Sequence, residues 1–248
     1  MKISAVVISF NEEKNIERCL KSLRPVADEI VVVDSGSKDK TEAICRRFGV
    51  RFFKRAWKGY SSAKNYGNEK AANDFIFSID SDEALSPELQ KSLREFKTSS
   101  PADAYRITIK TWYCGRWIEH SGWYPDTKVR FWNKKYGKWA GAIHEKVKLK
   151  EGSRVLALKG DLLNYGYYTV EEHLTQINLF TTLMAKNIVS QGGKTSLWKI
   201  LTRPIDLFFT MYFLRLGFLD GYQGFLIATI SSFGELIKHV KIRELLKD

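Results

Sequence analysis

The chain has 248 residues, of which 44% are hydrophobic, so it is long enough to bury a substantial core and to carry an extension beside it. The 40 basic and 28 acidic side chains leave a net charge of +12, which favours an anionic partner: a phospholipid surface, a nucleic acid or a phosphorylated small molecule. Three scattered cysteines without CxxC spacing indicate neither a zinc site nor a disulfide framework, and they fit a reducing cytoplasm.

The N-terminal segment is predicted to be a buried strand. Residues 2–9 are rich in apolar and β-branched side chains, the pattern of a strand covered on both faces in a parallel sheet. Polar and acidic residues follow at once, and no small-residue cleavage site appears, which argues against a signal peptide. We expect Asn11 to be the N-cap of a first helix that ends before Pro25.

Strands and helices are predicted to alternate up to about residue 80. Short apolar runs at 30–33, 50–53 and 75–79 are the further strands, with helical segments between them. This order predicts a parallel sheet with helices on both faces, in which ligands bind beyond the carboxyl ends of the strands. Polar segments follow three of these strands, and we expect them to meet at one edge of the sheet. They are Ser9-Phe10-Asn11, Asp34-Ser35-Gly36-Ser37 and Asp80-Ser81-Asp82-Glu83.

The middle of the chain is strand-like, aromatic and basic. Between residues 110 and 150, ten Lys and Arg side chains stand against three acidic ones, so we expect this stretch to face an anion, with a merely solvated surface as the alternative. Five Trp and three Tyr residues fall within 112–139. Aromatic faces hold sugars or bases, whereas the alternative interpretation is a small packed subdomain.

Beyond about residue 165 the sequence is predicted to be helical, over 170–189, 197–219 and 224–246. The last two segments are apolar and interspersed with Lys and Arg, which suits helices that lie in a membrane interface. A bundle packed against the rest of the chain, or against a second copy in a homo-oligomer, is the alternative. We expect no membrane-spanning helix, because no uncharged apolar segment reaches the roughly 20 residues required.

The strongest single signal for chemistry is Asp80-Ser81-Asp82, two carboxylates one residue apart after a buried strand. Mg²⁺ and Mn²⁺ prefer oxygen ligands, and Mg²⁺ is often held by one or two carboxylates together with substrate phosphates. Many surface turns contain Asp-x-Asp, but here it follows one strand while Asp34 and Asp39 follow another. We therefore predict a divalent cation held by Asp82 and Asp80.

Three sequence blocks resemble the signature blocks of family 2 inverting glycosyltransferases. They are Val6-Val7-Ile8-Ser9-Phe10-Asn11-Glu12-Glu13, Val33-Asp34-Ser35-Gly36-Ser37-Lys38-Asp39-Lys40-Thr41 and Ile79-Asp80-Ser81-Asp82-Glu83. Within this family the chain is most similar to lipopolysaccharide core glycosyltransferases of the inner-core β-1,4-glucosyltransferase type. That similarity rests on Gly122-Trp123-Tyr124-Pro125-Asp126, Gly141-Ala142-Ile143-His144-Glu145 and Gly217-Phe218-Leu219-Asp220-Gly221.

The resemblance covers essentially the whole chain and implies the GT-A fold. This is an α/β, Rossmann-like nucleotide-sugar-binding domain with a mainly parallel sheet, expected over residues 1–165. A helical C-terminal extension, associated with the membrane interface, is expected over residues 166–248.

The resemblance also implies roles for single residues on the donor side. Asp34 and Asp39 would line the nucleotide pocket, Asp80 would lie near the ribose and the cation, and Asp82 would hold the metal. Lys64 and Asn65 match a pair that contacts the donor phosphate or ribose, although such a pair on a helix can also be simply solvated. The predicted donor-binding residues are Ser9, Asn11, Glu12, Asp34, Ser37, Asp39, Lys64, Asn65, Asp80 and Ser81.

Inversion at the anomeric carbon requires a base that takes the proton of the acceptor hydroxyl. Many members of the family place this base in a Glu-Asp pair, whereas this chain has His144-Glu145 at that point. Glu145 is the candidate base. His144 is the second candidate, or else a metal or phosphate contact or a core residue, and Asp126 is a third carboxylate that would position the acceptor.

The function implied is transfer of a hexose from a nucleotide diphosphate sugar, expected to be a UDP-sugar, to a lipid-linked glycan acceptor in lipopolysaccharide or cell-surface glycan synthesis. The enzyme would be cytoplasmic and attached peripherally to the anionic inner face of the cytoplasmic membrane. Transfer to a polyprenyl phosphate by the same fold is the alternative, and it needs no protein base. We expect no nucleic-acid partner, because converging carboxylates without a metal would repel a polyanion.

Overall fold

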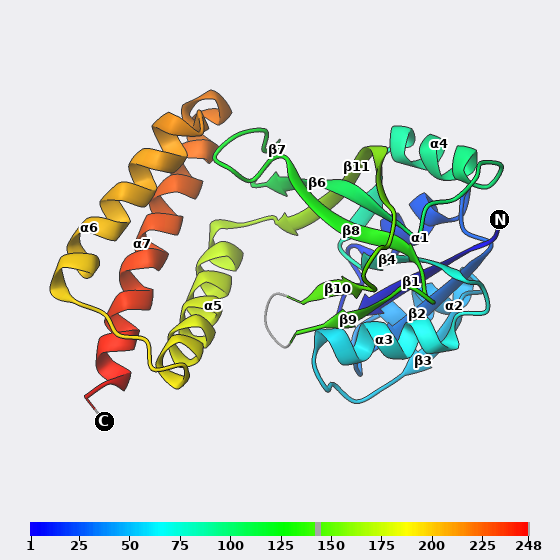
Figure 1. The fold of residues 1–248 in the computed structure, drawn as a ribbon, viewed down its shortest axis with the longest axis horizontal. Coiled ribbons are helices and arrows are strands. Elements are labelled where there is room, and N and C mark those ends of the chain that lie inside the picture. The colour runs from blue at the N-terminus through cyan, green and yellow to red at the C-terminus, as the bar shows by residue number, and fades with distance from the viewer. Residues whose placement is uncertain (142–144, 248) are drawn as a thin grey trace. The chain divides into compact units, whose positions relative to one another are not determined.

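The computed structural model describes residues 1–141 and 145–247. The chain forms two compact units, the first from Met1–Ile109 and Thr127–Tyr165 and the second from Lys110–Asp126 and Gly166–Asp248 (Figure 1). The structure thus groups residues 110–126 with the C-terminal helices. The division expected at residue 165 stays a prediction.

The first unit contains the parallel sheet that the alternation of strands and helices predicted. Its order is β3-β2-β1-β4, and all three neighbouring pairs are parallel. These strands are β1 (Ile3–Ser9), β2 (Glu29–Asp34), β3 (Arg51–Lys54) and β4 (Phe75–Asp80). The α/β class with a mainly parallel sheet and C-terminal helices is therefore confirmed.

The sheet continues beyond β4 with strands of the second half of the chain. β8 (Asp126–Asn133) runs antiparallel to β4, and the order then passes through β6 (Ala104–Tyr113) and β11 (Val155–Tyr167) to β5 (Glu83–Leu85). The short β7 (Arg116–Trp117) pairs with β6. β9 (Gly137–Ala140) and β10 (Lys146–Leu149) form a separate antiparallel pair.

Helices cover both faces of the parallel strands. Successive side chains of a strand point to opposite faces, so a strand that is apolar throughout has two faces to bury. Every residue of β1 is buried. Ala5 and Val7 pack in one cluster with the apolar side of α1 (Ile16–Leu23), to which α2 (Thr41–Arg47) and α4 (Pro87–Phe96) also contribute. Val6 and Ile8 pack in a second cluster with α3 (Tyr60–Lys70) and β9.

A glycine sets the close approach of α3 to the sheet. A Cβ atom added at Gly67 would lie 2.3 Å from Val6 Cγ1 and 3.1 Å from Val33 Cγ2. Any larger residue would have to push the helix away from β1 and β2. This close packing fixes the distance between α3 and the strands β1 and β2, and with it the position of the first turns of α3 near the strand ends.

The prediction that Asn11 caps the first helix is wrong. Helix α1 begins at Ile16, and its N-cap is Asn15, whose side chain makes no capping hydrogen bond. Asn11 instead has φ +55°, a left-handed conformation that Asn tolerates better than most residues. Its side chain accepts a hydrogen bond from the N–H of Lys38 at 2.9 Å, so a tertiary contact takes the place of the cap.

The second unit is dominated by α5 (Val170–Ser190), α6 (Leu197–Phe209) and α7 (Gly221–Leu245), with α7 packed against both of the others. The helix predicted over 197–219 is interrupted. A π-helical turn, η1 (Thr210–Leu214), follows α6, the chain breaks at Leu216 with φ +55°, and a 3₁₀ turn, η2 (Gly217–Asp220), leads into α7. None of the helices in residues 1–141 and 145–247 is long and apolar enough to cross a membrane.

A buried aspartate links the C-terminal helices to the segment 110–126 within the second unit. Asp220 is fully buried, and its carboxylate accepts hydrogen bonds from the N–H groups of Glu119 and His120. The ring Nδ1 of His120 lies 3.1 Å from Asp220 Oδ1. Asp220 belongs to the motif around Gly217, and its partners directly precede the motif around Gly122, so the two motifs lie near each other in the second unit.

Candidate active site

Three polar segments meet where the parallel strands end, as the alternation of strands and helices predicted. Ser9 is in register with Asp34 on the neighbouring strand, and Ile8 is in register with Asp80 on the other side. The residues that follow β1, β2 and β4 therefore lie at one edge of the sheet. This edge is where an open α/β sheet binds its ligand.

The loops after β1 and β2 are joined by hydrogen bonds between backbone N–H groups and side-chain oxygens. They are Asn11 N–H to Ser37 Oγ (2.8 Å), Glu12 N–H to Thr41 Oγ1 (2.8 Å), Glu13 N–H to Asp39 Oδ2 (2.9 Å), Lys38 N–H to Asn11 Oδ1 (2.9 Å) and Lys40 N–H to Glu13 Oε2 (3.0 Å). Because each side chain satisfies the backbone of the other loop, the two loops form one rigid rim. Four of the predicted donor-binding residues, Asn11, Glu12, Ser37 and Asp39, belong to it.

Asp39 of this rim and Asp34, at the end of β2 next to it, already accept hydrogen bonds from the protein. Asp34 is fully buried, and its Oδ1 accepts the N–H groups of Gly36 (2.9 Å) and Ser37 (2.8 Å). Burial alone would raise the pKa of Asp39, but hydrogen bonds from Thr41 and Glu13 outweigh it and lower that pKa. Both carboxylates hold the rim in shape, and their contact with a nucleotide stays a prediction.

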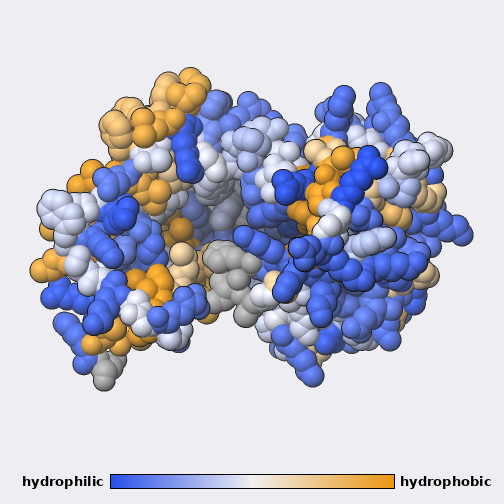
Figure 2. Space-filling view, viewed as in Figure 1, coloured by the Kyte–Doolittle hydropathy of each residue, from blue (hydrophilic) through white to orange (hydrophobic). Residues whose placement is uncertain are grey.

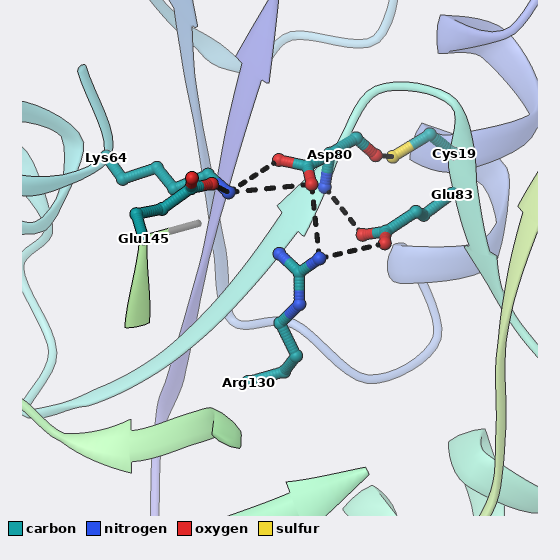
Figure 3. A network of polar contacts seen from close by, with 6 residues as sticks. All are labelled: Cys19, Lys64, Asp80, Glu83, Arg130 and Glu145. Atoms are coloured by element: carbon teal, nitrogen blue, oxygen red, sulfur yellow. Dashed lines mark hydrogen bonds and ion pairs between the residues drawn. The ribbon is translucent and has the colours of Figure 1, made fainter. Parts of the chain in front are cut away.

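At the end of β4, Asp80 is the centre of a network of charged side chains, three of which are buried (Figure 3). The ammonium of Lys64 lies 3.1 Å from Asp80 Oδ1 and 3.0 Å from Glu145 Oε1. Arg130 Nη2 lies 3.2 Å from Asp80 Oδ2 and 3.1 Å from Glu83 Oε1. Glu83 Oε2 in turn accepts the N–H of Asp80 at 2.8 Å. Lys64, Glu83 and Arg130 are all buried, so water screens these pairs little.

The network shifts its carboxyl groups in opposite directions. Burial acts to raise the pKa of Asp80, but Lys64 and Arg130 outweigh burial and hold that pKa well below its usual range. Burial raises the pKa of Glu83, with Asp80 adding to the rise and Arg130 opposing it. Burial and the neighbouring Glu83, Asp80 and Glu12 raise the pKa of Asp82 well above its usual range. Asp82 is therefore the acid that a further positive charge would relieve most.

The chemistry of these residues fits a divalent cation. The carboxyl groups of Glu12, Asp80, Asp82 and Glu83 raise one another's pKa, and Glu145 shares Lys64 with Asp80, whereas the network supplies two buried cations, Lys64 and Arg130. In the described parts of the chain, no three Asp, Glu, His or Cys side chains converge as a ready-made metal site. Mg²⁺ held by one or two carboxylates and by substrate phosphates requires no such group.

Lys64 and Asn65 are not solvated helix residues. Lys64 is buried, with its ammonium 4.4 Å above the ring of Trp139 in addition to its two ion pairs. The side chain of Asn65 donates to the carbonyl of Trp139 at 2.9 Å and accepts the N–H of Trp139 at 3.0 Å. Asn65 thereby fastens α3 to β9, the strand that leads toward Glu145. Direct contact of either residue with a donor stays a prediction.

The three residues predicted as candidates for the base differ in where they lie. Glu145 is brought to the strand edge by its ion pair with Lys64. His144 lies outside the described residues. Asp126 is the first residue of β8 and belongs to the second unit, so its role stays a prediction. The remaining predicted residues, Ser9 and Ser81, are buried at the ends of β1 and β4.

Arg130 and Glu83, the partners of Asp80, were not predicted as site residues. Arg130 lies inside the apolar run of β8, and a charged residue at such a place is a signal for a buried ion pair. Tyr60 and Trp57, whose rings meet edge to face at 4.7 Å and are about half exposed, were not predicted either. Burial raises the pKa of Tyr60, and Glu145, Asp80 and Asp82 add to the rise, so this phenol borders the carboxylates.

Known proteins match this chain over most of its length. Residues 4–146 match the family model described as glycosyl transferase family 2. An uncharacterized glycosyltransferase of Rickettsia felis is 32% identical, with 98% of this chain and 90% of the relative covered. The lipopolysaccharide core biosynthesis glycosyltransferase LpsC of Rhizobium meliloti is 27% identical, with 98% of this chain and 92% of the relative covered.

Solved structures match a smaller part of the chain. Glucosyl-3-phosphoglycerate synthase from Mycobacterium tuberculosis, in complex with Mn²⁺, UDP and glucosyl-3-phosphoglycerate, is 27% identical with a TM-score of 0.37. The match covers 45% of this chain and 44% of that one, so it spans less than half of either protein.

Proposed function

The chain belongs to glycosyl transferase family 2, and we propose that it transfers a hexose from a UDP-sugar to a lipid-linked saccharide in lipopolysaccharide or cell-surface glycan synthesis, with inversion at the anomeric carbon. The observation that carries this proposal is the buried lysine that joins Asp80 to Glu145 at the carboxyl edge of the sheet. It gives one site a carboxylate for the donor and a carboxylate for the acceptor. We further propose that the enzyme works at the inner face of the cytoplasmic membrane.

On the donor side, the rigid rim formed by the loops after β1 and β2 would hold the nucleotide. Asp82 and Asp80 would hold a divalent cation, Mg²⁺ or Mn²⁺, which supplies a Lewis acid for the charge that grows on the leaving diphosphate. Lys64 and Arg130 keep Asp80 ionised by lowering its pKa, so that this carboxylate is an anion throughout the working pH range.

On the acceptor side, Glu145 would take the proton of the attacking hydroxyl. The acceptor oxygen forms a bond to the anomeric carbon as the bond from that carbon to the diphosphate oxygen breaks. The proton passes to the Glu145 carboxylate, and the nucleoside diphosphate leaves with the electron pair. Because Lys64 engages Oε1 of Glu145, we assign the proton to Oε2.

A screen of donors tests the proposed activity most directly. We expect UDP-sugars to be hydrolysed slowly without acceptor when Mg²⁺ or Mn²⁺ is present, and GDP- and dTDP-sugars to be hydrolysed less. A preference for GDP- or dTDP-sugars would overturn the assignment of the nucleotide.

Replacing Asp82 by Asn should abolish the Mn²⁺ dependence of UDP binding and at the same time stabilise the metal-free protein. The fold raises the pKa of Asp82, so ionising this residue costs stability once the pH exceeds its unfolded value of roughly 3.9. Asn removes that cost at neutral pH, and we expect Tm to rise by about 2–4 °C. Calorimetry with UDP and thermal unfolding without metal measure the two effects.

The matched control is Asp74→Asn, which changes an exposed aspartate next to the opposite end of β4. It should alter neither UDP binding nor its metal dependence. UDP binding by Asp82→Asn that is still stimulated by Mn²⁺ would refute the metal assignment.

A further inference from the structure

Helix α6 has apolar side chains on two opposite faces. On one face Ile200 is buried, and Leu207 packs against a core cluster that includes Met211 of η1 and Ile227 and Ala228 of α7. Trp198, Leu201, Ile205 and Phe209 are spaced three and four residues apart, so they form a single stripe on the opposite side of the helix. We call these four residues the α6 outer face.

The α6 outer face is exposed to a degree that is unusual for such side chains. The exposed fractions are 74% for Trp198, 65% for Leu201, 71% for Ile205 and 53% for Phe209. Further exposed apolar or aromatic residues follow where α6 gives way to α7, and Figure 2 shows hydrophobic residues gathered over this turn. They are Phe213, Leu214, Leu216, Phe218, Leu219 and Tyr222. Contiguous apolar surface of this kind marks an interaction site.

The charges around this surface indicate which partner covers it. The basic side chains of Lys194, Lys199, Arg203 and Arg215 are exposed along the same segment, whereas Asp206 is its one exposed acid. Two copies of this surface brought face to face would place like charges against each other. Anionic phospholipid offers both an apolar boundary for the stripe and phosphates for the basic side chains. Trp198 also has the amphipathic ring that is favoured at the water–lipid boundary.

We propose that the α6 outer face docks onto an anionic phospholipid surface. Trp198, Leu201, Ile205 and Phe209 enter the boundary between headgroups and acyl chains, and the flanking Lys and Arg side chains contact headgroup phosphates. The choice of lipid as the partner rests on the proposed function, because a lipid-linked acceptor is presented at such a surface.

Vesicle co-sedimentation of the full chain tests the proposal. Vesicles of phosphatidylglycerol and phosphatidylethanolamine are the probe, and vesicles of phosphatidylcholine are the neutral control. We expect Leu201→Ser with Ile205→Ser to weaken binding about tenfold to hundredfold, because two exposed apolar side chains no longer leave water. The matched control, Leu174→Ser with Leu179→Ser, changes two exposed leucines of α5 and should leave binding unchanged.

A second pair of variants tests the charges. Lys199→Gln with Arg203→Gln should reduce binding to anionic vesicles and make it less sensitive to salt, because fewer headgroup charges are engaged. Two results would overturn the proposal. The first is full-length protein that stays in the supernatant with anionic vesicles. The second is a dimer in light scattering that Leu201→Ser with Ile205→Ser converts to a monomer, which would make a second copy the partner.

UDP binding is measured on the same variants without vesicles, because it separates this proposal from the proposed function. A variant that loses vesicle binding but keeps wild-type UDP affinity supports the docking surface. Wild-type protein that binds vesicles but binds no nucleotide would leave the docking surface standing and overturn the proposed function.

Discussion

Replacing Glu145 by Gln should lower kcat by roughly 10² to 10⁴, the usual contribution of a positioned general base. Gln keeps the size of the side chain and an oxygen that Lys64 can contact, but it does not accept the acceptor proton at neutral pH. UDP-sugar affinity should stay nearly unchanged, because Asp80 keeps Arg130 and Lys64 as partners. Steady-state kinetics and calorimetry with the donor measure the two quantities.

Two variants identify the base if Glu145 is not the one. His144→Ala should lose less activity than Glu145→Gln if His144 only supports the site, and Asp126→Asn should act mainly on KM for the acceptor. Wild-type turnover in Glu145→Gln together with an inactive His144→Ala or Asp126→Asn would transfer the role to that residue. Activity in all three would favour a phosphate acceptor, which is already an oxyanion.

Replacing Arg130 by Met should destabilise the fold by about 3–5 kcal/mol, the range measured when one partner of a buried ion pair is removed. Asp80 and Glu83 would then lack their shared guanidinium, and Glu83 is fully buried. Urea unfolding of the metal-free protein measures the loss. Arg46→Met, which breaks the exposed ion pair with Glu42, should change stability by less than about 1 kcal/mol.

The pH dependence of unfolding distinguishes lost charge from lost packing in Arg130→Met. The folded-state pKa of Asp80 is lowered, so its stabilising contribution is present above its unfolded pKa of roughly 3.9 and disappears as the pH falls through the folded value. The variant should therefore lose less stability on acidification than the wild type. Parallel acid-unfolding curves for the two proteins would mean that Arg130 acts by filling space.

The sequence was sufficient to predict the parallel strands and the meeting of their polar ends. Strands buried on both faces have continuous apolar sequences. The sequences of β1 and β4 have this pattern because helices cover both of their faces. The motif at Asp80 could be placed for the same reason, since it follows directly on such a run.

The features that the sequence did not reveal depend on partners far along the chain. Asn is a residue type that commonly caps helices, but the side chain of Asn11 accepts a hydrogen bond from Lys38 instead. The helix therefore starts four residues later than a cap at Asn11 would allow. Lys64 has the local sequence of a solvated helix residue, but it is buried and pairs with Glu145 and with the ring of Trp139, both distant in sequence. The break at Leu216 follows from the packing of η2 against α7, where a Cβ at Gly224 would lie 1.9 Å from the carbonyl oxygen of Gly217.

Lys64 is the shared counter-ion of Asp80 and Glu145, the carboxylates proposed for the donor and for the acceptor. Asp80 and Glu145 compete for one ammonium, so a ligand that draws Asp80 away from Lys64 leaves more of that ammonium's charge to Glu145. The free energies of substitutions at Asp80 and Glu145 will for this reason not be additive. Occupation of Asp80 is then linked to the protonation of Glu145 through this ammonium, whereas Glu145→Gln, which keeps an oxygen next to Lys64, changes that link little.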